Sequence, residues 1–176
     1  MKVVKHELIY KGKIFDLVKD TIEHEGHVFT REYVTYPGAV TMIPFDGRYV
    51  YFVKQYRHPA GKELLELPAG KLEQGEDPEE CAKRELQEEV GFIPGKLTLL
   101  SGFYTVPGYS REFMYLYLAE DLKESKLPED KDEFLKVIKL DVKDAMALLK
   151  EGKIQDAKTI IGLFYLLSFR LSDRFS

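Results

Sequence analysis

The sequence is poor in several residue types on which common sites and scaffolds depend. It has a single cysteine, Cys81, which excludes an internal disulfide and fits a reducing compartment. It contains no asparagine and few glutamines while lysine and glutamate are abundant, a balance typical of proteins from thermophiles. Its histidines, His6, His24, His27 and His58, show no metal-ligand spacing. A zinc site or a disulfide-linked fold is therefore not expected.

Long apolar runs and an excess of positive charge are also missing. The longest apolar run, residues 159–169, is too short to span a bilayer and predicts a buried helix. The segment MKVVKHELIYKGK is interrupted by charged residues and lacks the apolar core of a signal peptide. The formal net charge of -4 gives no basis for sequence-independent nucleic-acid binding. We therefore expect a cytoplasmic protein that binds neither nucleic acid nor membranes.

The alternation of polar and apolar residues predicts a globular, mixed α/β protein. Hydrophobic residues make up 44% of the 176 residues, enough for a substantial core. Residues 14–22 and 28–36 predict an N-terminal hairpin, and a DG dipeptide predicts a second hairpin from residues 39–44 and 49–56. Further strands are expected at 97–104, 112–118 and 134–140, helices at 142–151 and 156–171, and a long charged loop at 120–133.

The most informative segment is residues 70–92, GKLEQGEDPEECAKRELQEEVGF, which predicts a short helix with defined ends. Asp77 is a good N-cap, Pro78 suits the first turn, and Glu80 stands where a capping box places a glutamate. Gly91 provides the C-terminal stop. The expected buried stripe of this helix consists of Ala82, Leu86 and Val90.

Three carboxylates lie on one side of this helix, at Glu85, Glu88 and Glu89. Like charges at this spacing weaken a helix by about 0.2–0.5 kcal/mol per pair. A helix that keeps such a cluster without interleaved lysines usually has a cation to balance it. Carboxylate oxygens without a histidine or cysteine cluster favour Mg²⁺ or Mn²⁺ over Zn²⁺.

The same segment resembles the Nudix box, whose pattern is G-x5-E-x7-R-E-U-x-E-E-x-G-U, with U a bulky apolar residue. The fixed positions are filled by Gly70, Glu76, Arg84, Glu85, Leu86, Glu88, Glu89, Gly91 and Phe92. The resemblance implies a Nudix-type α/β/α sandwich with a mixed β-sheet core. Residues 1–37 would form an N-terminal hairpin region for dimerisation and substrate binding, and residues 38–176 the catalytic domain. The implied activity is Mg²⁺-dependent hydrolysis, with Mn²⁺ able to substitute, of a nucleoside diphosphate linked to another moiety.

The resemblance also implies roles for individual residues. The implied metal ligands are Glu85, Glu89, the assisting Glu88 and the backbone carbonyl of Ala69. Arg84 and Glu76 would pair with the ligand glutamates and orient them, as metal sites require. A metal-bound carboxylate is a poor proton acceptor, so the general base is expected elsewhere. The resemblance places it on Glu133, in a charged loop that also carries Glu129, Asp130 and Asp132.

Sequence outside the box resembles the ADP-ribose pyrophosphatase branch of the family. The resemblance is carried by Pro107, sixteen residues after Gly91, and by the runs VKQYRHPAGKELLELPAGKLE, REYVTYPGAV and EGKIQDAKT. Arg57 is the candidate to hold the diphosphate, because a guanidinium fork matches phosphate oxygens. Arg31 is a candidate for the adenosine side, and Glu112 for a ribose hydroxyl or the metals. The implied reaction converts ADP-ribose to AMP and ribose 5-phosphate in a homodimer.

Alternative functions stay open at this stage. The substrate could be another nucleoside diphosphate sugar, NADH or a dinucleoside polyphosphate. A sensor that binds ADP-ribose without cutting it is a second class, but such modules commonly lose box glutamates and this chain has all of them. A purely structural protein with an acidic helix would leave the register of the box unexplained.

Overall fold

The computed structural model describes residues 1–128 and 134–172, which fall into two units. The expected N-terminal region, residues 1–37, lies within the first unit, which also includes a later segment that the sequence did not assign to it. The first unit consists of Met1–Gly38 and Phe103–Met114, and the second of Ala39–Gly102 and Tyr115–Ser176.

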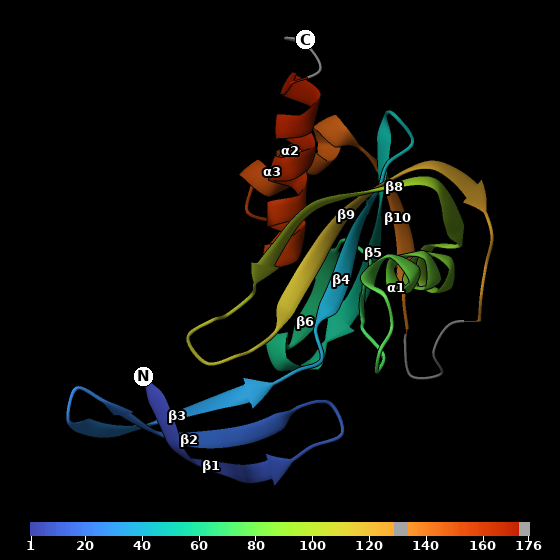
Figure 1. The fold of residues 1–176 in the computed structure, drawn as a ribbon. Coiled ribbons are helices and arrows are strands. Elements are labelled where there is room, and N and C mark those ends of the chain that lie inside the picture. The colour runs from blue at the N-terminus through green and yellow to red at the C-terminus, as the bar shows by residue number, and fades with distance from the viewer. Residues whose placement is uncertain (129–133, 173–176) are drawn as a thin grey trace. The chain divides into compact units, whose positions relative to one another are not determined.

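The first unit contains an antiparallel three-stranded sheet in the order β1-β2-β3 (Figure 1). The hairpin of β2 and β3 is confirmed, and it turns at Glu25 and Gly26, which both have positive φ. The first strand was not expected from the sequence, because almost all its residues are exposed and no buried face imposes an alternating pattern. The strands are β1 (Lys2–Lys11), β2 (Asp16–His24) and β3 (His27–Thr35).

Two further sheets, in the orders β10-β5-β6 and β7-β4-β9-β8, belong to the second unit except for the end of β8 and the start of β9. Two of these strands, β6 and β7, are short and were not predicted. The strand bounds are β4 (Ala39–Pro44), β5 (Tyr49–Arg57), β6 (Lys62–Glu66), β7 (Ala69–Lys71), β8 (Phe92–Tyr104), β9 (Phe113–Glu124) and β10 (Lys136–Asp141). The predicted loop at residues 120–133 is wrong over its first part, because β9 continues to Glu124.

The second predicted hairpin is also wrong as a pairing, although its turn exists. Asp46 accepts hydrogen bonds from the backbone N–H groups of Arg48 (3.1 Å) and Tyr49 (2.7 Å), as a turn residue does. Beyond one bridge between Phe45 and Val50, however, β4 and β5 belong to different sheets. Every residue of β4 is buried, and the strand lies between β7 and β9, so both of its edges are already occupied.

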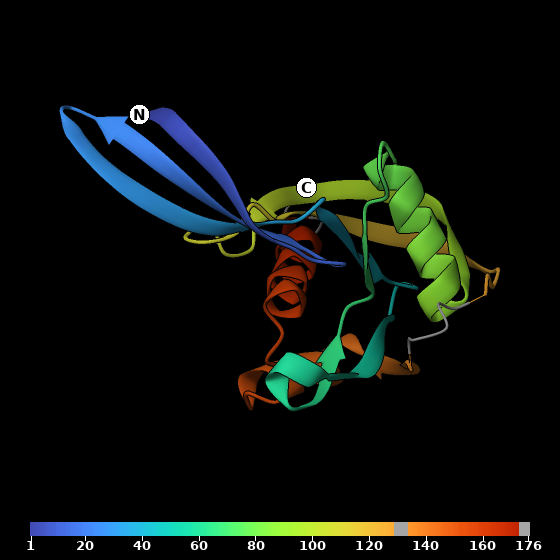
Figure 2. The same cartoon turned by 90° about the horizontal axis from the view of Figure 1, so that it is seen from below.

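Helices cover the strands of the second unit from two sides (Figures 1 and 2). Both α1 and α3 pack against β4. Leu86 and Val90 join the core on the α1 side, whereas Gly162 of α3 lets Leu67 and Ile43 approach on the other side. The helices are α1 (Pro78–Glu85), α2 (Val142–Lys150) and α3 (Ala157–Ser172), with a 3-10 turn at His58–Ala60. The mixed α/β fold is as expected. None of the helices described is long and apolar enough to cross a membrane.

Candidate active site

The helix α1 begins as the sequence predicts. The Asp77 carboxylate accepts hydrogen bonds from the backbone N–H groups of Glu79 (2.9 Å) and Glu80 (3.4 Å), which would otherwise lack partners in the first turn. The carboxylate of Glu80 pairs with Lys83 at 2.8 Å. The N-cap therefore fixes where the helix starts, and with it the direction in which the following glutamates point.

The helix continues into a π-helical turn, Leu86–Val90, which the sequence did not predict. Turns of this kind are rare and frequently occur at functional sites. Gly91 ends the turn with φ 83°, and its N–H donates to the carbonyl of Leu86 at 3.0 Å. The predicted buried stripe is confirmed: Ala82, Leu86 and Val90 are buried.

Two of the box glutamates are buried carboxylates. Glu85 is 8% exposed and Glu89 is 4% exposed, and both contact the short strand β7. The backbone N–H of Ala69 donates to Glu89 Oε2 at 2.9 Å. A Cβ built on Gly70 would lie 1.8 Å from the carboxylate carbon of Glu85, so only glycine leaves room for this side chain. The helix and β7 therefore hold both carboxylates against one stretch of backbone.

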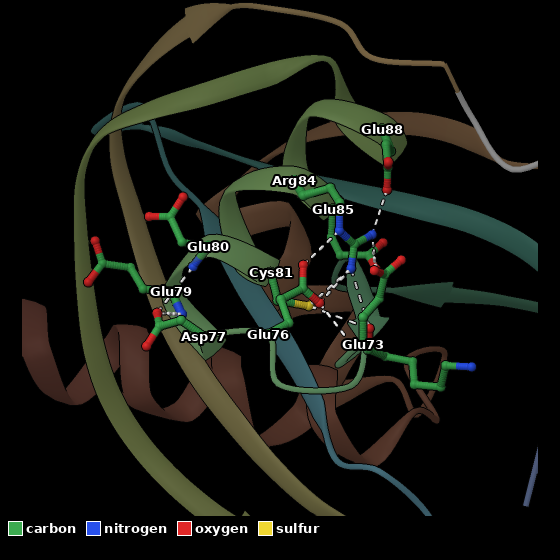
Figure 3. A network of polar contacts seen from close by, with 10 residues as sticks. Glu73, Glu76, Asp77, Glu79, Glu80, Cys81, Arg84, Glu85 and Glu88 are labelled. Atoms are coloured by element: carbon green, nitrogen blue, oxygen red, sulfur yellow. Dashed lines mark hydrogen bonds and ion pairs between the residues drawn. The ribbon is translucent and has the colours of Figure 1, made fainter.

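Arg84 links three carboxylates of the box (Figure 3). Its Nε and one terminal nitrogen donate to Glu76 at 2.9 and 3.0 Å. Its other terminal nitrogen donates to Glu85 at 2.8 Å and to Glu88 at 2.9 Å. The hydrogen bonds from Arg84 lower the pKa of Glu76 to about 2. The guanidinium group thus supplies part of the positive charge that the glutamate cluster was expected to need.

The donor atoms of this region fit a hard cation by their chemistry. Within residues 1–128 and 134–172, no group of three or more His, Cys, Asp or Glu side chains is arranged to hold a metal ion. The expected ligands Glu85, Glu89 and the Ala69 carbonyl nevertheless lie on adjoining elements and offer only oxygen, which Mg²⁺ and Mn²⁺ prefer. Their assignment as metal ligands stays a prediction.

Two candidate substrate-binding residues belong to the first unit. Arg31 donates to the backbone carbonyl of Thr30 at 2.9 Å, and its guanidinium lies 4.6 Å from the centroid of the Phe29 ring. Glu112 accepts a hydrogen bond from the Thr105 hydroxyl at 2.5 Å. The roles proposed for Arg31 and Glu112 are not decided by these contacts. The predicted base, Glu133, lies outside the described residues.

Arg57 has a partner that sequence reasoning missed. Its Nε and one terminal nitrogen donate to the two carboxylate oxygens of Glu66, each at 2.8 Å. Glu66 also accepts a hydrogen bond from Lys158, and both of these residues are buried. The only signal in the sequence was that both residues stand within runs used for the branch resemblance, LELPAGK and EGKIQDAKT.

Comparison with known proteins decides the family. A model of the NUDIX domain matches residues 35–162. The chain belongs to the Nudix family. The match includes the whole box and most of the second unit, and Nudix hydrolases generally use divalent metal ions. The prediction of a Nudix hydrolase is thereby confirmed at the level of the family.

This Nudix chain is similar to characterised proteins along most of its length. It is 41% identical over 169 residues to the ADP-ribose pyrophosphatase of Bacillus subtilis (strain 168), covering 94% of the chain and 91% of that protein. The same values hold for the methanol dehydrogenase activator of Bacillus methanolicus. A crystal structure of an ADP compounds hydrolase aligns with a TM-score of 0.85 at 24% identity, covering 98% of this chain and 95% of that one. The last comparison shows the fold.

Proposed function

We propose that the chain hydrolyses ADP-ribose to AMP and ribose 5-phosphate with Mg²⁺ as its metal. The observation that carries this proposal is the 41% identity to the Bacillus subtilis ADP-ribose pyrophosphatase, which extends over 94% of the chain. Similarity confined to the box would support only the cleavage of some diphosphate compound. Similarity that continues through the segments outside the box supports a shared substrate.

The residues of the box are suited to bring a metal and a diphosphate together. Glu85, Glu89 and the carbonyl of Ala69 would hold the ion. When bound, Mg²⁺ supplies charge that screens the phosphates and lowers the pKa of a coordinated water. Arg84 holds the side chains of Glu85 and Glu88 in place through the hydrogen bonds described above. Such fixed carboxylates can act without a costly rearrangement during the reaction.

The proposed reaction is a hydrolysis at phosphorus. The oxygen of a water molecule forms a bond to one phosphorus, the bridging P–O bond breaks, and the other phosphate leaves. A carboxylate accepts the proton of the attacking water, and we assign this role to Glu133. Arg57 would contact the diphosphate, Arg31 the adenosine side, and Glu112 a ribose hydroxyl.

A panel of substrates tests this proposal. The purified protein is incubated with Mg²⁺ or Mn²⁺ and ADP-ribose, a second nucleoside diphosphate sugar, NADH or a dinucleoside polyphosphate. We expect ADP-ribose to give the highest kcat/KM, AMP and ribose 5-phosphate to be the products, and a chelator to abolish turnover. A higher kcat/KM for another compound would identify that compound as the preferred substrate in place of ADP-ribose. Binding of ADP-ribose without cleavage would identify a sensor.

A second candidate function rests on the relative from Bacillus methanolicus. That protein is a methanol dehydrogenase activator and is as similar to the chain as the Bacillus subtilis enzyme. The chain would then raise the activity of a dehydrogenase. Adding it to a methanol dehydrogenase assay distinguishes the two: a rise in turnover that persists in Glu89→Gln would favour activation independent of hydrolysis.

The proposed assembly is a homodimer formed through the first unit. The strands β1 and β3 of its sheet carry exposed apolar side chains, which a partner subunit would cover. The exposed side chains are Val3, Val4, Leu8, Ile9, Tyr10 and Val28. Light scattering is expected to give twice the mass of the chain, and Leu8→Lys to shift the protein toward the monomer. An active monomer whose mass does not change with concentration would contradict this assembly.

A cytoplasmic location is proposed from the cysteine content. Cys81 is fully buried, and burial raises the pKa of its thiol, so that the side chain is kept protonated. A single buried thiol of this kind suits a reducing compartment. Fractionation of cells that express the protein, followed by immunoblotting, would place it.

A further inference from the structure

Two charged side chains from separate elements, Glu66 and Lys158, meet at the phosphate-binding candidate Arg57. Arg57 lies at the end of β5, Glu66 at the end of β6 and Lys158 in the first turn of α3. Glu66 is 1% exposed, and one of its oxygens accepts from both Arg57 and Lys158. Arg57 keeps 42% of its side-chain surface exposed. The carboxylate is therefore enclosed, whereas the Arg57 side chain is partly exposed.

The same contacts fix the start of α3. Lys158 pairs with Asp156 at 3.1 Å, and the Asp156 carboxylate accepts from the backbone N–H of Thr159 at 3.0 Å. The Thr159 hydroxyl in turn accepts from the N–H of Leu67 at 2.7 Å. The residue directly after Glu66 is thus bonded to the same helical turn that supplies Lys158, so this turn and the end of β6 hold each other in place.

The chain beyond Glu66 leads directly to the metal candidates. The carbonyl of Pro68 accepts hydrogen bonds from the N–H of Met42 at 3.0 Å and from the hydroxyl of Thr41 at 3.1 Å. The next residue, Ala69, donates to Glu89. The negative charge of Glu89 contributes to raising the pKa of Arg57, after the larger effect of the hydrogen bonds to Glu66. The hydrogen-bonded segment from Leu67 to Ala69 therefore connects Glu66, the partner of Arg57, to the buried carboxylate of Glu89.

The charges of the three residues suit the recognition of an anion. Burial alone would raise the pKa of Glu66, but the hydrogen bonds from Arg57 and the charge of Lys158 lower it, so Glu66 is ionised. If Glu66 met only Arg57, the two charges would cancel. Lys158 shares the Glu66 carboxylate with Arg57 and also pairs with Asp156, so Glu66 does not neutralise Arg57 alone, and the Arg57 side chain stays partly exposed. Buried ion pairs are often no better for stability than apolar packing, which points to a role other than stability.

We propose that Glu66 and Lys158 are positioning residues for Arg57: Glu66 fixes the orientation of the guanidinium, and Lys158 keeps its charge available to the diphosphate. The inference rests on the proposed function in taking the ligand to be a nucleoside diphosphate, but not on which moiety is attached to it. Neither residue needs to touch the substrate. Their effect is expected on substrate binding and not on the chemical step.

A double-mutant cycle on kcat and KM tests the proposal. The paired change Glu66→Gln with Lys158→Met removes one negative and one positive charge together, and is made with and without Arg57→Ala. The substrate is the nucleotide that the unmodified protein cleaves fastest. The paired change should raise KM about tenfold, the scale of one hydrogen bond to a charged group, with kcat nearly unchanged. In the Arg57→Ala protein the paired change should alter KM less than about twofold, because the effects of substitutions at residues that act through one another are not additive.

Two further variants keep the outcome clear. The single variant Lys158→Arg retains the positive charge and should have a KM close to that of the unmodified protein. Lys153→Met is the matched control, since Lys153 pairs with Glu151 on the surface and should leave KM unchanged. If the paired variant does not fold, Lys158→Met alone replaces it in the cycle, with a smaller rise in KM expected.

The positioning role would be overturned if the paired change raised KM by the same factor with and without Arg57. It would also be overturned if the paired change lowered both kcat and the melting temperature, and did so in the Arg57→Ala protein as well. Failure of the proposed function is seen separately, in the substrate panel with the unmodified protein. A preferred substrate other than ADP-ribose changes the function without affecting the cycle, which is run on whichever diphosphate compound is cleaved.

Discussion

Replacing Glu89 by glutamine is expected to lower kcat by roughly 10²–10⁴ while the fold survives. A bound metal ion stabilises the charge that develops in the transition state by several kcal/mol, and about 1.4 kcal/mol corresponds to a factor of ten in rate. Glutamine preserves the shape of the side chain, and its carbonyl oxygen can still accept the hydrogen bond from the N–H of Ala69. What it loses is the charge that a divalent ion requires. Steady-state kinetics at saturating Mg²⁺ with thermal melting measures both effects.

The same helix provides the comparison variants. Glu85→Gln should cause a similar loss, because the second buried carboxylate is assigned to the same ion. Glu80→Gln is the matched control, since Glu80 pairs with Lys83 on the exposed side of α1 and should leave kcat unchanged. Near-native kcat for both Glu85→Gln and Glu89→Gln would show that these residues do not hold the metal.

Replacing Glu133 by glutamine is expected to lower kcat by about 10²–10⁴, the usual cost of removing a general base. Binding of Mg²⁺ and ADP-ribose should stay nearly unchanged, because the base acts on the attacking water and not on the ground-state complex. Single-turnover kinetics gives the rate of the chemical step, and calorimetry with the non-cleaving variant gives the two affinities.

Neighbouring carboxylates in the same segment are the controls for this assignment. Glu129→Gln and Asp132→Asn change the charge by the same amount and should reduce kcat less than tenfold, below the range typical of a general base. A loss under tenfold at Glu133 together with a larger loss at Glu129 would transfer the role to Glu129. A pH profile of kcat on the variant with the larger loss would then show whether the acidic limb has disappeared.

The features that could be predicted from the sequence are those that depend on near neighbours in the chain. The N-cap Asp77, the stop at Gly91 and the buried stripe between them were correct because caps and helical periodicity involve residues a few positions apart. The hairpin of β2 and β3 was correct for the same reason. The family pattern itself supplied the fold, which periodicity alone did not give.

The features that could not be predicted depend on which segments meet in three dimensions. The DG turn at Asp46 was identified, but whether the strands on either side pair is decided by β7 and β9, which occupy both edges of β4. The strand β1 was missed because exposed residues carry no constraint on polarity. In the site, the contacts of Arg84 are mostly within the box, whereas Lys158 meets Glu66 from 92 residues away. No local rule relates such a pair.

The π-helical turn at Leu86–Val90 has a consequence for how the length of this chain can vary. Successive residues of an α-helix are about 100° apart, so residues three or four positions apart lie on one side and residues two positions apart do not. A deletion between Glu85 and Glu88 would leave an α-helical turn in which Glu88 stands two positions after Glu85 and points to the opposite side. An insertion there would move Glu89 to the fifth position after Glu85, where an α-helical turn would not place it beside Glu85. Aligned relatives should therefore show gaps in the loops on either side of α1, but not within these 5 residues.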